Sequence, residues 1–212
     1  MKSLLPLTAM LLVAACSAPE APQAGSGTTA SPSAPAPESA PTAAEAGLPT
    51  ELTPATLCAF SLADTKNVHV FDGVLTAAQP SAAALEAARA LGVKSVLNQR
   101  KPAEMEKVDF DERAVAEGLG MTYTHMPWNG PDELTDELLD QTRAYLREAP
   151  RPILYHCASA NRVGAGWAAW RALDGGVDID TAIAEGKAVG MRTEAYEPKV
   201  RDYVARRAAS GG

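Results

Sequence analysis

Short apolar runs alternate with helical stripes over residues 68–155, and this alternation predicts an α/β fold. Residues 68–78 indicate two short strands around Asp72-Gly73, a residue pair typical of tight hairpin turns. Further apolar runs predict strands at 93–97, 121–126 and 153–155. Helical spacing predicts helices from Pro80 to Gly92, over 111–119 and from Thr135 to Pro150. Strands separated by helices in this way favour a mainly parallel central sheet flanked by helices.

The last third of the chain predicts helices only, over 163–173, 179–189 and 199–209. In parallel α/β sheets, reacting groups gather where the carboxyl ends of strands meet the amino ends of helices. The segment after 153–155 is such a junction, because it runs directly into the helix expected from Val163. We therefore expect the functional site there.

A different pattern covers the first fifty residues, which hold eight of the sixteen prolines. An apolar run from Leu4 to Ala15, too short to span a bilayer, indicates a secretory signal. The end of this run, Val13-Ala14-Ala15-Cys16, resembles the lipobox of bacterial lipoproteins. The resemblance implies that residues 1–15 are removed and that Cys16 is acylated. An ordinary signal peptide cut near Ala15 is the alternative.

Residues 16–50 consist almost wholly of Ala, Pro, Ser, Thr, Gly and Glu, so they cannot bury a core and are expected to form a disordered tether. The lipoprotein resemblance also implies a cell-envelope protein that is held to the membrane by its lipid and faces the periplasm. Ser17, directly after the cysteine, implies the outer membrane by the same resemblance. Residues 51–212 are expected to form the folded α/β domain.

Charge and cysteine content exclude several function classes. The 212 residues carry a net charge of −7, and residues 51–212 carry −5 without a basic cluster, which argues against a nucleic-acid partner. The three cysteines, at 16, 58 and 157, are too few for a disulfide scaffold and include no close pair for zinc. We therefore expect neither a metal nor another cofactor. Cys58 is expected to be structural, with a disulfide to Cys157 as the alternative in an oxidising compartment.

Cys157 ends the strand 153–155 and is followed by the small residues Ala158-Ser159-Ala160, before Asn161-Arg162-Val163 opens a helix. Small side chains let successive amides point inward as an anion nest, and the helix amino end adds positive potential. This environment favours a nucleophilic thiolate at Cys157. The planar fork of Arg162 can hold two oxygens of an oxyanion. The residues expected to form the anion site around them are His156, Ala158, Ser159, Ala160, Asn161, Val163 and Arg100.

Several ordered motifs together resemble the beta-lactamase-hydrolase-like phosphatase domains, bacterial members of the cysteine-phosphatase superfamily. The motifs are Ala78-Gln79-Pro80, residues 92–100, residues 120–127 and the loop from His156 to Gly164. The resemblance covers most of residues 68–175 and implies a tyrosine-phosphatase-like fold. It also implies a phosphoric monoester hydrolase acting on a phosphorylated small molecule or phosphoprotein through a phospho-cysteine intermediate. Cys157 is then the nucleophile and Arg162 the oxyanion clamp.

Two departures from the family pattern keep other functions open. Only four residues separate Cys157 from Arg162, whereas protein tyrosine phosphatases have five, and the shorter spacing is like the persulfide loop of rhodanese sulfurtransferases. Ala160 stands where the resembled loop usually has glycine, and a positive φ there would cost about 1 kcal/mol. A sulfurtransferase using the same Cys157, or an inactive lipoprotein that binds an anion or a partner, are therefore alternatives.

A phosphatase also needs a general acid to protonate the leaving group. In the superfamily this acid is an Asp in the loop that here follows Met126-Pro127. Asp132 is the first candidate in that loop and Glu133 the second. Neither residue aligns well with the family position, and sulfur transfer would not require one.

Overall fold

The computed structural model describes residues 50–210, and its centre is a mixed sheet with the strand order β1-β2-β3-β6-β4-β5. The strands are β1 (Cys58–Ala59), β2 (His69–Phe71), β3 (Val74–Ala77), β4 (Ser95–Asn98), β5 (Thr122–His125) and β6 (Ile153–His156). The first three pair antiparallel, and β3, β6, β4 and β5 pair parallel. The helices are α1 (Ala82–Ala90), α2 (Pro102–Met105), α3 (Glu112–Gly118), α4 (Asp136–Glu148), α5 (Asn161–Leu173), α6 (Ile179–Val189) and α7 (Tyr196–Ala209), with short 3₁₀ turns at Thr50–Leu52 and Pro131–Glu133.

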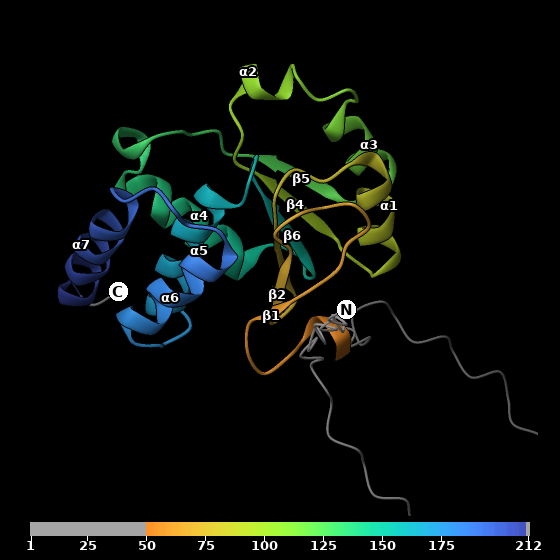
Figure 1. Ribbon diagram of the computed structural model, residues 1–212. Coiled ribbons are helices and arrows are strands. Elements are labelled where there is room, and N and C mark those ends of the chain that lie inside the picture. The colour runs from red at the N-terminus through yellow and green to blue at the C-terminus, as the bar shows by residue number, and fades with distance from the viewer. Residues whose placement is uncertain (1–49, 211–212) are drawn as a thin grey trace, which may run out of the picture. The chain divides into compact units, whose positions relative to one another are not determined.

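Helices cover both faces of the sheet, as Figure 1 shows. Successive strand residues point to opposite faces, so Leu154 packs in one cluster with side chains of α1 and α3, such as Leu85 and Ala116. Its neighbours Ile153 and Tyr155 pack in the other cluster, with Trp167 of α5 and Leu146 of α4. Both faces of β6 are thus buried, as expected for a central parallel strand.

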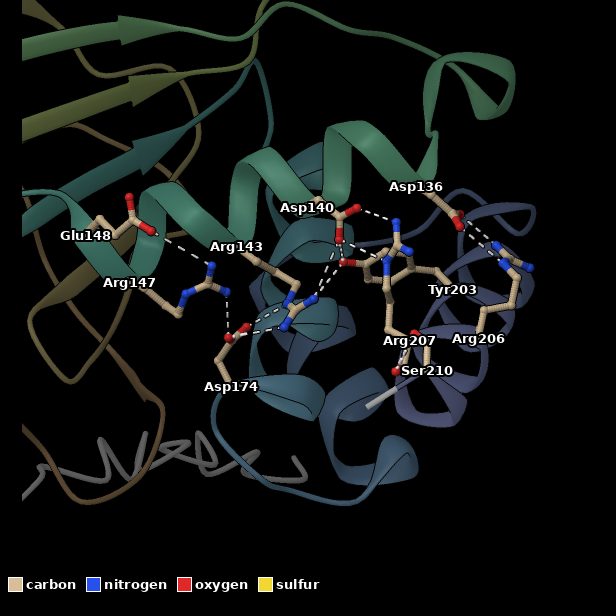
Figure 2. A network of polar contacts seen from close by, with 10 residues as sticks. All are labelled: Asp136, Asp140, Arg143, Arg147, Glu148, Asp174, Tyr203, Arg206, Arg207 and Ser210. Carbon is tan, nitrogen blue, oxygen red and sulfur yellow. Dashed lines mark hydrogen bonds and ion pairs between the residues drawn. The ribbon is translucent and has the colours of Figure 1, made fainter. Parts of the chain in front are cut away.

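The helices α6 and α7 pack on α5 rather than on the sheet (Figure 1). A polar network at the outer surface joins α4, α7 and the end of α5 (Figure 2). Asp174, directly after α5, accepts hydrogen bonds from Arg143 and Arg147 of α4, while the Tyr203 hydroxyl of α7 donates to Asp140. These contacts fasten α7 against α4 and thereby support the helix that carries the predicted site.

The sequence-based elements match the structure closely, with four differences. The short helix α2, which begins at Pro102, is not among the expected helices, and the two-residue strand β1 is too short to give a recognisable pattern. The helix expected from Val163 begins at Asn161, so Arg162 lies in its first turn. The last helix begins at Tyr196 instead of 199. The starts of α1, α3 and α4 lie close to the expected positions because each has an N-cap residue that the sequence shows. Ser81, Asp111 and Thr135 each accept a hydrogen bond from a first-turn amide.

The expected signal segment 1–15, the acylation of Cys16 and the tether 16–50 fall outside the described residues, apart from Thr50. Within residues 50–210, no helix has the length and apolar character that crossing a membrane requires.

Candidate active site

The strand β6 carries His156 to the carboxyl edge of the sheet, and Cys157 follows it directly. The Cys157 side chain is 1% exposed, and its amide faces the carbonyl of Ala77 on β3 at 3.4 Å. Ala158 and Ser159 are the accessible part of the loop, and Ser159 forms an isolated bridge with Ala78. Cys157 is a free thiol, so the alternative disulfide between Cys58 and Cys157 is wrong.

Ala160 turns the loop into α5 with φ 64° and ψ 2°, which is the left-handed conformation. A positive φ was the condition under which strain was expected at Ala160, and the structure has this positive φ. The turn places Asn161, Arg162 and Val163 in the first turn of α5, where backbone amides without helical partners face the loop. The predicted loop residues 156–163 therefore form one continuous strand, turn and helix start around Cys157.

Arg162 is buried beside Cys157, and carbonyl and carboxylate oxygens fix its guanidinium. Nη1 donates to the carbonyls of Gln99 at 3.0 Å and Trp128 at 2.8 Å. Nη1 and Nη2 each donate to one carboxylate oxygen of Glu104 at 2.7 Å, a bidentate pair. Among the described residues, no oxygen accepts from Nε or from the second hydrogen of Nη2, so this edge of the fork is available for an oxyanion.

Electrostatics strengthen the same arrangement. Burial lowers the pKa of the Arg162 guanidinium, but its hydrogen bonds to Glu104 and its electrostatic interactions with Cys157 and Glu104 outweigh this effect and raise the pKa above its ordinary value. The hydrogen bond from Arg162 lowers the pKa of Glu104, against the effect of burial. Both groups are therefore charged at neutral pH. Sequence reasoning missed Glu104, although its place three residues after Lys101, at the start of α2, is that of a capping carboxylate.

His156 lies behind the loop in a buried polar network. Its Nε2 lies 2.8 Å from Oε1 of Glu112, and Gln79 donates to the other oxygen of Glu112 at 2.5 Å. Burial raises the pKa of Glu112, but the electrostatic interaction and hydrogen bond with His156 and the hydrogen bond from Gln79 bring it below its ordinary value. This position supports a role for His156 in orienting the loop.

Arg100 belongs to the network behind the loop. Its guanidinium donates to Oε1 of Gln79 at 2.5 Å and to the carbonyl of Glu104 at 2.6 Å. Its side chain therefore connects the network around His156 to the segment that holds Arg162. Its expected contact with the substrate stays a prediction.

The segment after β5 reaches the site, but its two acids, both exposed, differ in the contacts that they make. The carbonyl of Trp128 binds Arg162, which places this segment against the guanidinium. Glu133 is engaged by Lys101 at 2.8 Å and by the amide of Asn129 at 2.7 Å. Asp132 is exposed in the 3₁₀ turn. The structure therefore leaves Asp132 free to act, and its role as general acid remains a prediction.

The segment between α6 and α7 also contacts the loop after Cys157, a contact that no sequence pattern indicates. Asn161 binds the amide of Arg192 at 2.7 Å, and the Arg192 side chain donates to Oγ of Ser159 at 2.7 Å. The hydroxyl of Ser159, a residue expected in the anion site, therefore accepts a hydrogen bond from Arg192. In residues 50–210, no group of three or more His, Cys, Asp or Glu side chains could hold a metal ion.

Residues 52–174 match the sequence profile of the beta-lactamase hydrolase-like protein, phosphatase-like domain. A beta-lactamase hydrolase-like protein of Agrobacterium fabrum is 27% identical over 128 residues, which is 59% of this chain and 30% of that protein. The chain therefore spans about a third of that relative's length.

Solved structures are similar as well. TpbA of P. aeruginosa has 25% identity and a TM-score of 0.54, and the match covers 74% of this chain and 94% of TpbA. A cysteine-to-serine variant of TpbA in complex with phosphotyrosine has 24% identity and a TM-score of 0.55, with 75% and 98% covered. A putative phosphatase of Neisseria meningitidis has 23% identity and a TM-score of 0.53, with 62% and 94% covered. Sequence profile and fold agree, and the chain belongs to the beta-lactamase hydrolase-like phosphatase family.

Proposed function

We propose that the protein is a cysteine-dependent phosphohydrolase that acts on phosphomonoesters. The observation that carries this proposal is the buried Arg162, whose fork has one edge bound by Glu104 and the other edge open beside Cys157. A fixed guanidinium next to a nucleophile, with helix amides around it, is suited to the negative charge of a phosphoryl group in transfer. Phosphotyrosine bound to the TpbA variant supports a phosphorylated protein or small molecule as the substrate class.

In the first step, the Cys157 sulfur attacks phosphorus and the bond to the leaving oxygen breaks, with Asp132 donating the proton. Arg162 and the amides at the start of α5 hold the equatorial oxygens. In the second step, the Asp132 carboxylate takes a proton from water while the water oxygen attacks phosphorus, the sulfur–phosphorus bond breaks, phosphate is released and the thiolate is restored. His156, held by Glu112, orients the loop through both steps.

The full chain should release nitrophenolate from p-nitrophenyl phosphate under reducing conditions. Cys157→Ser should abolish this activity, because serine is not ionised at neutral pH. Asp132→Asn should lower kcat more for a poor leaving group than for nitrophenolate, about tenfold or more, because only the poor leaving group needs a proton. No turnover by the wild-type protein between pH 5 and pH 8 would refute the proposal.

Sulfur transfer is the second candidate, favoured by the four-residue spacing between Cys157 and Arg162. In that reaction the Cys157 thiolate takes one sulfane sulfur from thiosulfate, which leaves as sulfite, and passes it to cyanide as thiocyanate. Mass spectrometry after thiosulfate treatment should then show one added sulfur on Cys157. The inactive anion-binding alternative predicts vanadate binding with both assays silent.

We further propose an envelope location through a lipid on Cys16, as the Val13-Ala14-Ala15-Cys16 segment indicates. Wild-type protein expressed in a bacterial host should enter the detergent phase of a Triton X-114 separation. Cys16→Ser should move it to the aqueous phase. A wild-type protein that stays in the aqueous phase would contradict lipidation and leave the phosphatase proposal untouched.

A further inference from the structure

The segment Gly190–Thr193, between α6 and α7, is fixed to the catalytic loop. Asn161 Oδ1 accepts from the amides of Arg192 at 2.7 Å and Thr193 at 3.2 Å, and Asn161 Nδ2 donates to Oγ1 of Thr193 at 2.8 Å. A Cβ on Gly190 would lie 3.0 Å from the Cβ of Ala160, so glycine permits this close approach. The segment is therefore held in a fixed position beside the loop, although it lies about thirty residues further along the chain.

Arg192 extends from this segment to the accessible part of the loop. Its Nη2 donates to Oγ of Ser159 at 2.7 Å, and its Nη1 lies 3.5 Å from the carbonyl of Ser159 and 3.4 Å from that of Gly190. These neutral acceptors orient the guanidinium without neutralising it. The side chain is exposed, and the contacts leave further N–H groups of the five in a guanidinium.

The absence of a counter-charge distinguishes Arg192 within an acidic protein. In residues 50–210, every arginine has a carboxylate within ion-pair distance except Arg89, Arg100 and Arg192. Arg100 is buried in the network behind the loop, and Arg89 lies on α1. Among the described arginines, Arg192 is thus the one that is exposed, has no carboxylate within ion-pair distance and contacts the loop after Cys157.

A second segment, residues 64–67, also contacts the loop at Ser159. The side-chain amide of Asn67 donates to the carbonyl of Ser159 at 3.2 Å, and the carbonyl of Lys66 accepts from the amide of Ala78 at 3.0 Å. Lys66 is exposed and has no ion pair among the described residues. The acid of this segment, Asp64, is bound by the hydroxyl of Ser81 at 2.6 Å. Arg192 and Asn67 therefore both contact Ser159, and they reach it from two different segments.

We propose that Arg192 forms a second anion subsite, which selects phosphomonoesters that carry a further anionic group close to the phosphate. The inference rests on the proposed function, because the catalytic loop must hold the reacting phosphoryl group. The second group, a carboxylate or another phosphate, binds the N–H groups that Arg192 leaves unused. No protein carboxylate has to be displaced, so the charge of the guanidinium is fully available to the ligand.

The test compares kcat/KM of the full chain for phenyl phosphate and 3-carboxyphenyl phosphate. Arg192→Gln keeps a donor for Ser159 but removes the charge, and should lower kcat/KM for the carboxylated substrate about tenfold more than for phenyl phosphate. Arg89→Gln removes the same charge far from the loop and should leave the ratio between the two substrates unchanged. Equal losses on both substrates would show that Arg192 only stabilises the loop and would overturn the subsite, as would no loss on either substrate.

Binding separates this inference from the proposed function. On the Cys157→Ser protein, calorimetry should show that adding Arg192→Gln weakens pyrophosphate about tenfold more than inorganic phosphate. If this difference holds while the wild-type protein hydrolyses no phosphomonoester, the proposed function fails and the subsite stands. If hydrolysis occurs and the affinities for the two anions fall equally, or if neither anion binds, the subsite is overturned.

Discussion

The guanidinium of Arg162 is oriented by Glu104 before any substrate binds. The carboxylate of Glu104 accepts hydrogen bonds along one edge of the guanidinium, and the carbonyls of Gln99 and Trp128 accept further hydrogen bonds from Nη1. The remaining edge is thereby aligned toward Cys157 without rearrangement during the reaction. Glu104 is a positioning residue in this arrangement, because it acts through Arg162.

Glu104→Gln should lower kcat/KM for p-nitrophenyl phosphate about tenfold or more, because a charged, bidentate pair becomes a weaker single contact. The loss should fall mainly on kcat, since the oxyanion is held most strongly in the transition state. Glu106→Gln, an exposed change two residues along the chain, is the matched control and should keep wild-type kinetics. Unchanged kcat in Glu104→Gln would remove this role from Glu104.

Ala160 carries local strain, because an alanine with φ 64° lies in the left-handed region. Ala160→Gly should therefore raise the free energy of unfolding in urea by about 1 kcal/mol, reduced slightly because the methyl group no longer packs against its neighbours. Ala158→Gly is the control, since Ala158 has no positive φ, and it should lower the same quantity slightly. A destabilised Ala160→Gly protein would show that packing of the methyl group outweighs the strain.

Among the elements, the site depends on contacts that α5 makes with segments far away in the sequence. Gly190 ends α6 with φ 145° and lies against Ala160, at the start of α5. This contact transmits the packing of α6 on α5 to the catalytic loop. The polar network of Figure 2 fixes α7 to α4 and α4 to the end of α5.

Gly190→Ala should lower both the free energy of unfolding and kcat/KM. The new Cβ would lie too close to Ala160, and the alanine backbone would have to keep a φ that is unfavourable for any residue with a side chain. We expect a loss of about 1–3 kcal/mol in stability, measured by urea unfolding. Gly118→Ala in α3, where a Cβ meets nothing within 4 Å and φ is not positive, should instead raise stability by about 1 kcal/mol. A Gly190→Ala protein with wild-type stability and activity would contradict this account of the contact.

At the scale of the whole molecule, the stability of the fold should fall at acid pH. The carboxyl groups whose pKa lies below the ordinary value are Glu104, Glu112, Glu133, Asp136, Asp178 and Glu197. Such a group contributes stability that is complete above its unfolded pKa, 4.5 for Glu and 3.8 for Asp, and is lost as the pH falls through its folded pKa. Burial lowers the pKa of His69, which acts in the same direction below its ordinary value of 6.5.

Thermal unfolding should therefore show a Tm that declines slightly below pH 6.5 and steeply below about pH 4.5. High salt should reduce the part of the decline in Tm that comes from exposed ion pairs such as Lys187–Glu197 and Arg206–Asp136. Salt screens the attraction within these pairs more than it screens the interactions of the buried Glu112. A Tm that rises between pH 7 and pH 4 would contradict the pKa directions on which this expectation depends.

The sequence alone determined the fold class and the centre of the site. Both depend on short stretches of sequence. Strand and helix periodicities are local patterns, and Cys157, Ala160 and Arg162 lie within six consecutive residues at the junction of β6 and α5. Only the tertiary structure decided what surrounds this loop. Glu104 lies 58 residues from Arg162, Glu112 lies 44 from His156 and Arg192 lies 33 from Ser159. These partners meet because of the strand order, the parallel register and the paths of the connecting segments, which residue spacing along the chain does not encode.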